Sequence, residues 1–471
     1  LRPLAVHFDN TWNSKIAVEN IQCMLRKLDI DLYTYVVDND EYDDIYRAML
    51  ASGTPDVESP TDLGLASVLN MACEKHGIRY IFDMDYLRLI ALVILLPAFL
   101  KQIGSQPRTR FLAATPDKLL LGYLLVNITL VFLVSSITGT ARTSFLLFID
   151  IFLPYAIASR LLRDTNDLSA AMFSYILGVT ILAAIGFFEF SKRWLLYSTL
   201  DESWGLDWNY GSYLLRVESL RALATAGHAI AFGYAMAIGF CMLLGLKHRF
   251  QNKNVWIFML CVLALGLASS YSRGPWAGAI AGSLVFFLTG AKKGKNLGKL
   301  ILSGVILIPT ALLTPLGEML LEPVTVESGN YDYRQRLLEI SLGVLLANPL
   351  FGAFDFIYSP VMQELKQGQG IIDIVNTYLA IGLGSGLVGL SLFTGFFLTI
   401  GYRLWRQIEL QAGENPAQGD VGRSLLATLA CILVTIFTVS SITIIPILYY
   451  FVAGLAVSYV RLVTLNNHSK L

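Results

Sequence analysis

The chain has 471 residues, of which 55% are hydrophobic and only 15% are charged. Soluble globular domains carry about 25% charged residues, so this composition excludes an ordinary soluble protein and indicates a polytopic membrane protein. The formal net charge is zero, so the total charge indicates no nucleic acid partner. The five cysteines form no CxxC pair, and their spacing predicts neither a disulfide framework nor a metal site.

Residues 1–83 alternate between strand-like and helix-like segments. The pattern predicts strands at 4–8, 31–37 and 78–82, with amphipathic helices between them. Such alternation is typical of a parallel sheet covered by helices. We therefore expect a small N-terminal α/β fragment in front of the membrane domain.

Three stretches of this head resemble the N-acetyl sugar amidotransferases of the N-type ATP-pyrophosphatase group. They are VHFDNTWNSKIAVENIQ (6–22), DIDLYTYVVDNDEYDDI (29–45) and SPTDLGLASVLNMACEKHGIRYIF (59–82). In that family, an SGGxDS loop that binds the phosphates of ATP lies upstream of this region. The resemblance therefore implies a truncated, nonfunctional fragment at 1–83, followed by a polytopic domain at 84–471.

The rest of the chain is dominated by long apolar segments. A membrane-spanning helix needs about 20 predominantly apolar residues, and eleven segments approach that length. The first is short and contains Pro97, which predicts a broken or re-entrant segment there. The predicted spans are 86–103, 119–138, 143–162, 168–190, 223–245, 254–271, 274–291, 298–317, 376–402, 424–441 and 443–461.

Every second loop between these spans is rich in Lys and Arg. Because short basic loops remain in the cytoplasm, the alternation supports the span count and assigns the loops 191–222 and 318–375 to the other side. We expect an all-α multi-pass protein of a bacterial inner membrane, with 318–375 as a large periplasmic loop. The basic residues that define the alternation are Lys101, Arg108, Arg110, Lys118, Arg160, Arg163, Lys247, Arg249, Lys253, Lys292, Lys293, Lys295, Lys299, Arg403, Arg406 and Arg423.

Polar residues gather on the predicted periplasmic side. Arg273 is the strongest candidate, because it is the only charge between Lys253 and Lys292, and charges at membrane depth are usually functional. Several arginines near one face favour a phosphate or diphosphate ligand, whose oxygens the guanidinium binds bidentately. The other candidates are Arg216, Arg221, His228, Arg334, Arg336, Asp373 and Asn376.

Each candidate also has a purely structural alternative. Arg216 and Arg221 could be interfacial side chains that snorkel to water, and His228 could be a packed, hydrogen-bonded histidine. Arg334 and Arg336 could be ordinary solvated residues of the long loop.

Four stretches resemble the O-antigen ligase/polymerase superfamily: RALATAGHAIAFGY (221–234), SRGPWAG (272–278), RQRLLEISLGVLLANPLFG (334–352) and DIVNTYLAIGLGSGLVGL (373–390). The resemblance implies an integral-membrane glycosyltransferase of O-antigen or exopolysaccharide synthesis. Such an enzyme takes glycan from an undecaprenyl-diphosphate carrier and joins it to a glycan or lipid acceptor. The resemblance implies no metal and no other cofactor, because the diphosphate carrier is itself the activated leaving group.

The resemblance also assigns roles to the arginines. Arg221 and Arg273 match the two arginines that would hold the diphosphate and offset the charge that develops on it. Arg334 or Arg336 would correspond to the loop arginine ahead of the PLFG turn.

One departure concerns the catalytic base. Many ligases have a His before the Asn that opens the late span, but here that position is Val375, with Asn376 retained. Asp373 or His228 could serve as the base instead. The missing His favours a polymerase-like or divergent member over a lipid A-core ligase.

Two other function classes compete with this interpretation. A polysaccharide transporter or flippase would typically have inverted repeats with broken helices, and no repeat is visible. The head alone would suggest a sugar amidotransferase. The glycines at 382, 384, 386 and 389 imitate a nucleotide-binding loop, but no strand precedes them, so we expect them to permit close helix packing.

Overall fold

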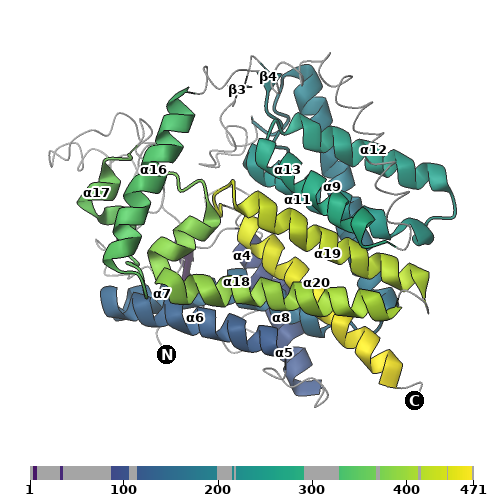
Figure 1. Cartoon of the computed structure of the whole chain (residues 1–471), viewed down its shortest axis with the longest axis horizontal. Helices are drawn as coiled ribbons and strands as arrows, with labels where there is room; N and C mark the ends of the chain where they lie inside the picture. Colours follow the sequence, from purple (N-terminus) through teal and green to yellow (C-terminus); the bar gives the residue numbers. More distant parts are fainter. Residues whose placement is uncertain are drawn as a thin grey trace. The chain divides into compact units, whose positions relative to one another are not determined.

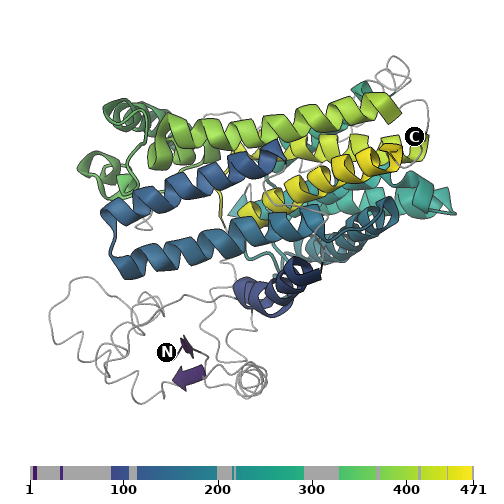
Figure 2. The same ribbon diagram turned by 90° about the horizontal axis from the view of Figure 1, so that it is seen from below.

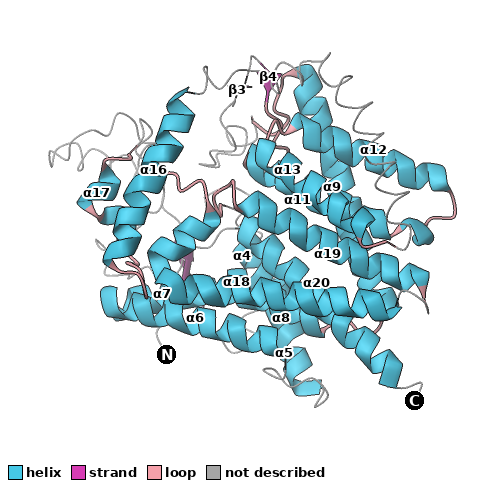
Figure 3. Ribbon diagram, viewed as in Figure 1, coloured by secondary structure: helices cyan, strands magenta, loops and turns pink. Residues whose placement is uncertain are grey.

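The computed structural model is overwhelmingly helical in the part of the chain that it describes (Figure 3), which confirms the all-α prediction for the membrane domain. Two compact units emerge, residues 1–93 with 197–212 and residues 94–196 with 213–471. The described residues are 4–7, 32–35, 86–105, 114–198, 215–216, 219–290, 328–366, 372–411, 415–442 and 444–468.

The first unit contains a parallel pair of short strands. β1 (Leu4–His7) pairs with β2 (Leu32–Tyr35), with Leu4 opposite Leu32. These strands match two of the predicted ones in place and direction. The helix expected between them and the strand expected at 78–82 lie outside the described residues, so the α/β fragment as a whole remains a prediction.

The helical part begins at Tyr86 and continues to His468 (Figure 1). Its elements are α4 (Tyr86–Ile90), η1 (Ala91–Leu95), α5 (Leu96–Ser105), α6 (Thr115–Val134), α7 (Ile137–Leu147), η2 (Phe148–Phe152), α8 (Leu153–Arg160), α9 (Thr165–Lys192), β3 (Leu215–Arg216), β4 (Ser219–Leu220), α11 (Ala229–Gly245), η3 (Lys247–Arg249), α12 (Lys253–Ser269), α13 (Arg273–Leu288), α16 (Ser328–Ala347), η4 (Phe356–Tyr358), α17 (Pro360–Gln363), α18 (Thr377–Gln411), α19 (Pro416–Ile436) and α20 (Ile445–His468).

Six described helices are long and apolar enough to cross a membrane, so the chain is a multi-pass membrane protein. α11 and α12 are apolar but shorter, and they occupy two further predicted spans. The span expected at 298–317 lies outside the described residues, so the count of eleven remains a prediction. The six long helices are Thr115–Val134, Ile137–Arg160, Thr165–Lys192, Thr377–Gln411, Pro416–Ile436 and Ile445–Leu465.

The expected disturbance at Pro97 is a π-helical turn. η1 ends immediately before the Leu96–Pro97 pair, and η2 has the same relation to Pro154. A proline lacks an N–H, and its ring clashes with the carbonyl four residues earlier. A local π turn accommodates this clash without ending the helix.

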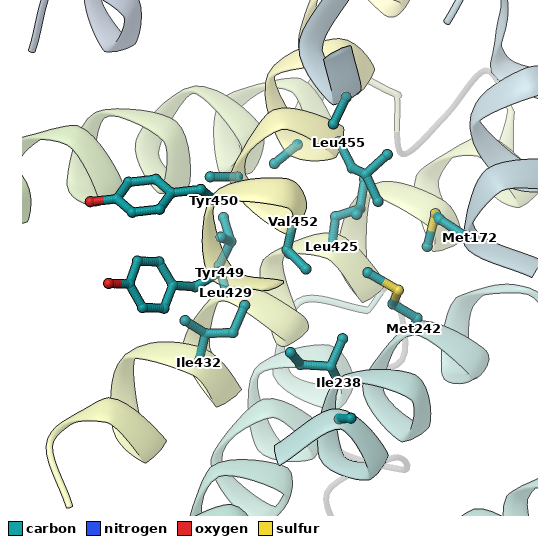
Figure 4. Packing of buried hydrophobic residues seen from close by; sticks show 14 of the residues in the cluster. Met172, Ile238, Met242, Leu425, Leu429, Ile432, Tyr449, Tyr450, Val452 and Leu455 are labelled. Carbon is teal, nitrogen blue, oxygen red and sulfur yellow. The ribbon is translucent and has the colours of Figure 1, made fainter. Parts of the chain in front are cut away.

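α11 forms the centre of the second unit. Its residues are buried on almost every side of the helix. A helix in such a position must be apolar all round, as α11 is. Figure 4 shows Ile238 and Met242 of α11 facing Leu425 and Leu429 of α19, with Val452 of α20 beside them.

α13 packs closely against α19 through glycines spaced four residues apart. A Cβ on Gly278 would lie 2.0 Å from Thr435 Oγ1, and one on Gly282 would lie 2.6 Å from the Ala427 carbonyl oxygen. Such small residues let membrane helices approach closely. The contact fixes α13, whose first residue is Arg273.

α18 is broken at Gly386, where φ is 63° and ψ is −166°. The turn after α16 fills the break, because Leu387 N donates to Pro349 O (2.9 Å) and Val388 N donates to Leu350 O (3.1 Å). Backbone groups at membrane depth must be satisfied by protein, because lipid offers no partners. The expectation that Gly386 serves helix packing therefore needs correction: this glycine permits a break.

Much of the loop expected at 318–375 is also ordered. It includes α16, α17 and a small core of its own, built from Leu337, Phe356, Met362 and Ile374. Arg334 and Arg336 lie on α16 within this long connection, and both are exposed.

The helices of the second unit have two distinct ends (Figure 2). We call the end where α6, α9 and α19 begin and α18 and α20 finish the basic end. Arg403 Nη2 donates to Thr115 Oγ1 there (2.8 Å), and Arg249 Nη1 donates to Asn166 O (3.5 Å). The described basic residues that the sequence assigns to one side of the membrane, such as Arg249 and Arg403, thus lie together at the basic end. The opposite end, where α11, α13 and α18 begin, is called the site end.

Candidate functional site

Arg221 connects two parts of the site end. It follows directly after the β3–β4 hairpin, whose last residue, Leu220, is fully buried. Its Nε donates to the Ser270 carbonyl oxygen (3.3 Å), and its Nη2 donates to Ser272 Oγ (2.8 Å). Ser270 and Ser272 belong to the connection between α12 and α13, so Arg221 is bound to the residues immediately before Arg273.

A buried carboxylate holds the main chain beside Arg221. Glu189, near the end of α9, is 0% exposed. Its Oε2 accepts hydrogen bonds from Leu223 N (3.1 Å) and Ala224 N (2.8 Å), and its Oε1 accepts from Leu196 N (3.2 Å). Glu189 is not among the predicted site residues, although a lone carboxylate in the predicted span 168–190 was an available signal.

Arg273 is the first residue of α13, and it is exposed. The expected helix break lies before it, because α12 ends at Ser269 and Pro275 belongs to the first turn of α13. Tyr271 has a positive φ of 47°, is fully buried and stacks on Phe190 with ring centroids 5.4 Å apart. The backbone before Arg273 is thus held in a turn.

His228 is the N-cap of α11. Its Nδ1 accepts a hydrogen bond from Ile230 N (3.1 Å), so Nδ1 is unprotonated and the neutral ring carries its proton on Nε2. Burial lowers the pKa of His228, and the charge of Arg221 lowers it further, whereas the charge of Asp373 acts in the opposite direction. Arg221 and Asp373 therefore both lie within electrostatic reach of His228.

Asp373 lies just before α18 and is held from two sides. Its Oδ1 accepts a hydrogen bond from Ser440 Oγ, in the connection between α19 and α20. Its main chain exchanges two hydrogen bonds with the Tyr333 hydroxyl of α16, both 3.0 Å long. Its Oδ2 makes no hydrogen bond to the described residues, which leaves that oxygen available to a ligand.

The connection between α19 and α20 joins these parts, and the sequence analysis missed it. Thr377 Oγ1 donates to Val439 O (3.0 Å) and lies 2.9 Å from Ser441 Oγ. A Cβ added to Gly274 would lie 2.5 Å from Thr438 Oγ1, so this connection also touches the start of α13. The run TVSS at 438–441 was the available signal, because it places four small residues, three of them polar, at the end of the predicted span 424–441.

Asn376 has a structural position. Its Oδ1 accepts a hydrogen bond from Leu379 N (3.1 Å), which caps the start of α18. The preceding Val375 is half-buried and contributes to the small core below α16.

The remaining candidates lie farther from these contacts. Arg336 Nη2 is 3.5 Å from Glu364 Oε2, and both side chains are largely exposed, so this is a surface ion pair. Arg334 is exposed on α16, next to Tyr333. The backbone of Arg216 pairs with Ser219 in the hairpin, and its side chain lies outside what the structure describes.

Comparison with known protein families gives one match. A family model described as O-antigen ligase matches residues 258–394, which run from α12 through the broken part of α18. The match includes Arg273, Asp373 and Asn376, whereas Arg221 and His228 precede it. No curated protein matches the chain. Residues 258–394 therefore match the O-antigen ligase family, and this match supports a glycan-processing function for a chain whose six long apolar helices make it a multi-pass membrane protein.

Proposed function

We propose that the protein is a glycosyltransferase that transfers or polymerises glycan from an undecaprenyl-diphosphate carrier on the periplasmic side of the inner membrane. The observation that supports this most strongly is the attachment of Arg221 to Ser270 and Ser272, immediately before Arg273. Arg221 is thereby fixed to the same turn of chain that leads into Arg273, and a pair of arginines suits the two phosphates of a diphosphate.

In this proposal the arginines act on the leaving group. The acceptor hydroxyl attacks the anomeric carbon of the donor glycan, and the bond from that carbon to the diphosphate oxygen breaks. The electron pair of this bond stays with the diphosphate, whose added charge Arg221 and Arg273 stabilise. Because Arg221 is already fixed by two hydrogen bonds, little reorganisation accompanies the charge transfer.

Asp373 is the better of the two candidate bases. Its Oδ2 is available to accept the proton of the acceptor hydroxyl, while Ser440 holds Oδ1 in place. His228 uses Nδ1 for the α11 cap, so its other nitrogen, Nε2, carries the proton and can only donate a hydrogen bond. We assign His228 the role of a hydrogen-bond donor to the diphosphate or the sugar, not that of a base.

For the loop arginine we favour Arg334 over Arg336. Arg334 adjoins Tyr333, whose hydroxyl binds the main chain of Asp373, whereas Arg336 is paired with Glu364. Arg216 and Asn376 support the site through the β3–β4 hairpin and the α18 cap.

A transporter of lipid-linked glycan is the competing function, and the broken α18 is the feature that favours it. In known transporters such breaks bind substrate, but here the turn at 349–352 occupies the break. The filled break agrees better with an enzyme that is held rigid.

The decisive experiment uses purified protein in detergent micelles with lipid-linked glycan extracted from the native host. A glycosyltransferase releases free polyprenyl diphosphate whether it ligates or polymerises the glycan. A transporter makes no chemical product, and in micelles it has no second compartment to which it could move the glycan. We expect Arg221→Ala and Arg273→Ala to reduce this release by about 100-fold or more. Arg→Lys should restore little, because an ammonium group cannot bind bidentately.

Lys192→Ala is the matched control, since Lys192 is an exposed cation at the same end of the helices, and it should leave the release unchanged. Release at the wild-type rate from both arginine variants would refute the proposed site. If the wild-type protein releases no polyprenyl diphosphate but carries glycan across vesicle membranes, the protein is a transporter.

A further inference from the structure

The basic end contains a pocket that the proposed function does not use. Its volume is about 260 Å³, and it lies between the start of α6, the second half of α18 and the second half of α20. These helices pack side by side (Figure 1). Along α20, roughly 25 Å of helix separates this pocket from the site end, so the two sites are independent.

Two arginines and an uncapped helix end contribute positive charge to the pocket. Arg403 of α18 and Arg461 of α20 both line it. Ala114, the N-cap of α6, also lines it and offers no side-chain hydrogen bond to the first turn. The positive end of the α6 dipole therefore adds to the two guanidinium charges.

These charges are not neutralised by the described residues. No described carboxylate lies within ion-pair distance of Arg403 or Arg461. Asp117, the acidic residue in the first turn of α6, is engaged by Arg160, and both are almost fully buried. The pocket therefore keeps an excess of positive charge.

The two guanidinium groups keep donors available. Arg403 gives one hydrogen bond to Thr115, and Arg461 bonds to the Leu162 carbonyl oxygen and to Ser458 Oγ. Arg461 Nε is buried and has no hydrogen-bond partner among the residues that the structure describes. A snorkelling arginine would carry its head group into water, so the buried Nε indicates a guanidinium held inward for a ligand.

The other walls of the pocket are apolar. Ile400, Val457, Val460 and Leu465 supply most of the lining. A ligand that matches both parts has an anionic group for the arginines and a hydrocarbon chain for the walls. Because basic ends face the cytoplasm, the leaflet next to the pocket is the one that holds anionic lipids.

We propose that this pocket binds the phosphate headgroup of an anionic phospholipid from the cytoplasmic leaflet. The phosphodiester lies between Arg403 and Arg461, and one acyl chain follows the apolar wall between α18 and α20. The bound lipid ties α6, α18 and α20 together at the end that is remote from the proposed diphosphate site.

The test measures lipid binding to the purified full chain by native mass spectrometry in detergent. Wild-type protein should bind phosphatidylglycerol at least roughly tenfold more tightly than zwitterionic phosphatidylcholine. The double variant Arg403→Gln/Arg461→Gln should lose this preference. Arg406→Gln is the matched control, because Arg406 is an exposed cation one turn farther along α18 that does not line the pocket, and it should keep the preference.

Two further arms make the result decisive. Val460→Trp fills the pocket while both arginines remain, and it should also abolish the preference, which guards against misfolding of the double variant. Inorganic phosphate should compete only weakly with phosphatidylglycerol. A wild-type protein without preference for phosphatidylglycerol overturns the proposal, as does a double variant that binds it normally. Strong displacement by inorganic phosphate would overturn the lipid as occupant in favour of a free anion.

Discussion

His228 illustrates how a residue selected for catalysis also performs a structural task. Its Nδ1 caps α11, and its neighbours include a cation, Arg221, and an anion, Asp373. Protonation of Nδ1 would break the hydrogen bond from Ile230 N, because two N–H groups would then face each other. It would also add a second positive charge beside Arg221. Binding of one proton to His228 Nδ1 would therefore change both the cap of α11 and the charge of the site.

This linkage predicts a dependence of stability on pH. Burial lowers the pKa of His228 below its usual value of 6.5, so the unfolded chain binds this proton more readily than the folded one. Stability rises with pH wherever the unfolded state binds more protons, so the unfolding temperature in detergent should fall as the pH drops below about 6.5. His228→Asn keeps a capping side chain without a titratable group, and its unfolding temperature should depend less on pH. Equal pH profiles for both proteins would contradict this.

Glu189 acts on the site through the backbone. Three N–H groups donate to its carboxylate, and two of them belong to Leu223 and Ala224, directly after the Arg221 segment. Ala224 has a positive φ of 45°, a conformation that an alanine rarely adopts unaided. The carboxylate supports this turn and so positions Arg221.

Glu189→Gln should therefore weaken both stability and activity. The amide replaces one accepting oxygen with a donor, and a hydrogen bond to a charged group contributes about 1.5–3 kcal/mol. We expect a loss of that size in the free energy of unfolding, measured by chemical denaturation, together with slower release of polyprenyl diphosphate. Glu409→Gln, at an exposed position of α18, is the control and should change neither. Unchanged stability of Glu189→Gln would remove Glu189 from the site's support.

Among the helices, α18 depends most on a partner distant in the sequence. Its break at Gly386 leaves backbone groups that the turn at 349–352 satisfies, and Ala353 N adds a hydrogen bond to Leu383 O (2.7 Å). A Cβ on Gly386 would lie 2.3 Å from the Leu350 carbonyl oxygen. The break therefore fixes the end of α16 against the first part of α18, and Asp373 and Asn376 lie just before that helix.

Gly386→Ala should be strongly destabilising. The backbone conformation is almost exclusive to glycine and costs an L-residue about 1–3 kcal/mol, and the new Cβ also displaces the turn. The measurement is the thermal unfolding midpoint of the purified protein. Gly384→Ala is the control two residues away, because its Cβ would meet only Phe356 Cε1 at an ordinary 3.7 Å. Equal midpoints for the two variants would show that the break does not hold the turn.

Local patterns predicted the elements but not the contacts that place them. Apolar segments, Lys- and Arg-rich loops and the motifs around Arg221 and Arg273 were visible in the sequence, and the helices and the shared basic end follow from them. The break at Gly386 was not predictable, because a glycine that packs and a glycine with positive φ look alike in an apolar segment. A lone carboxylate in an apolar segment marked Glu189 as unusual, but the roles of Glu189 and Ser440 arise from partners far away in the chain, which the sequence does not show.

At the scale of the whole molecule, the proposed function belongs to the helical part of the chain. The residues that hold or carry the candidate site lie between Glu189 and Ser441, and the family match lies within the same region. We therefore expect the head to contribute nothing to glycan transfer.

Deletion of residues 1–83, so that the chain starts at Met84, tests this expectation. The shortened protein should accumulate in the membrane and release polyprenyl diphosphate at the full-length rate, because every proposed ligand of the diphosphate is retained. A longer deletion, of residues 1–105, is the comparison: it also removes the apolar helix 86–105 and should reduce accumulation in the membrane. If the protein without residues 1–83 accumulates normally but releases no polyprenyl diphosphate, the head is a working part of the enzyme.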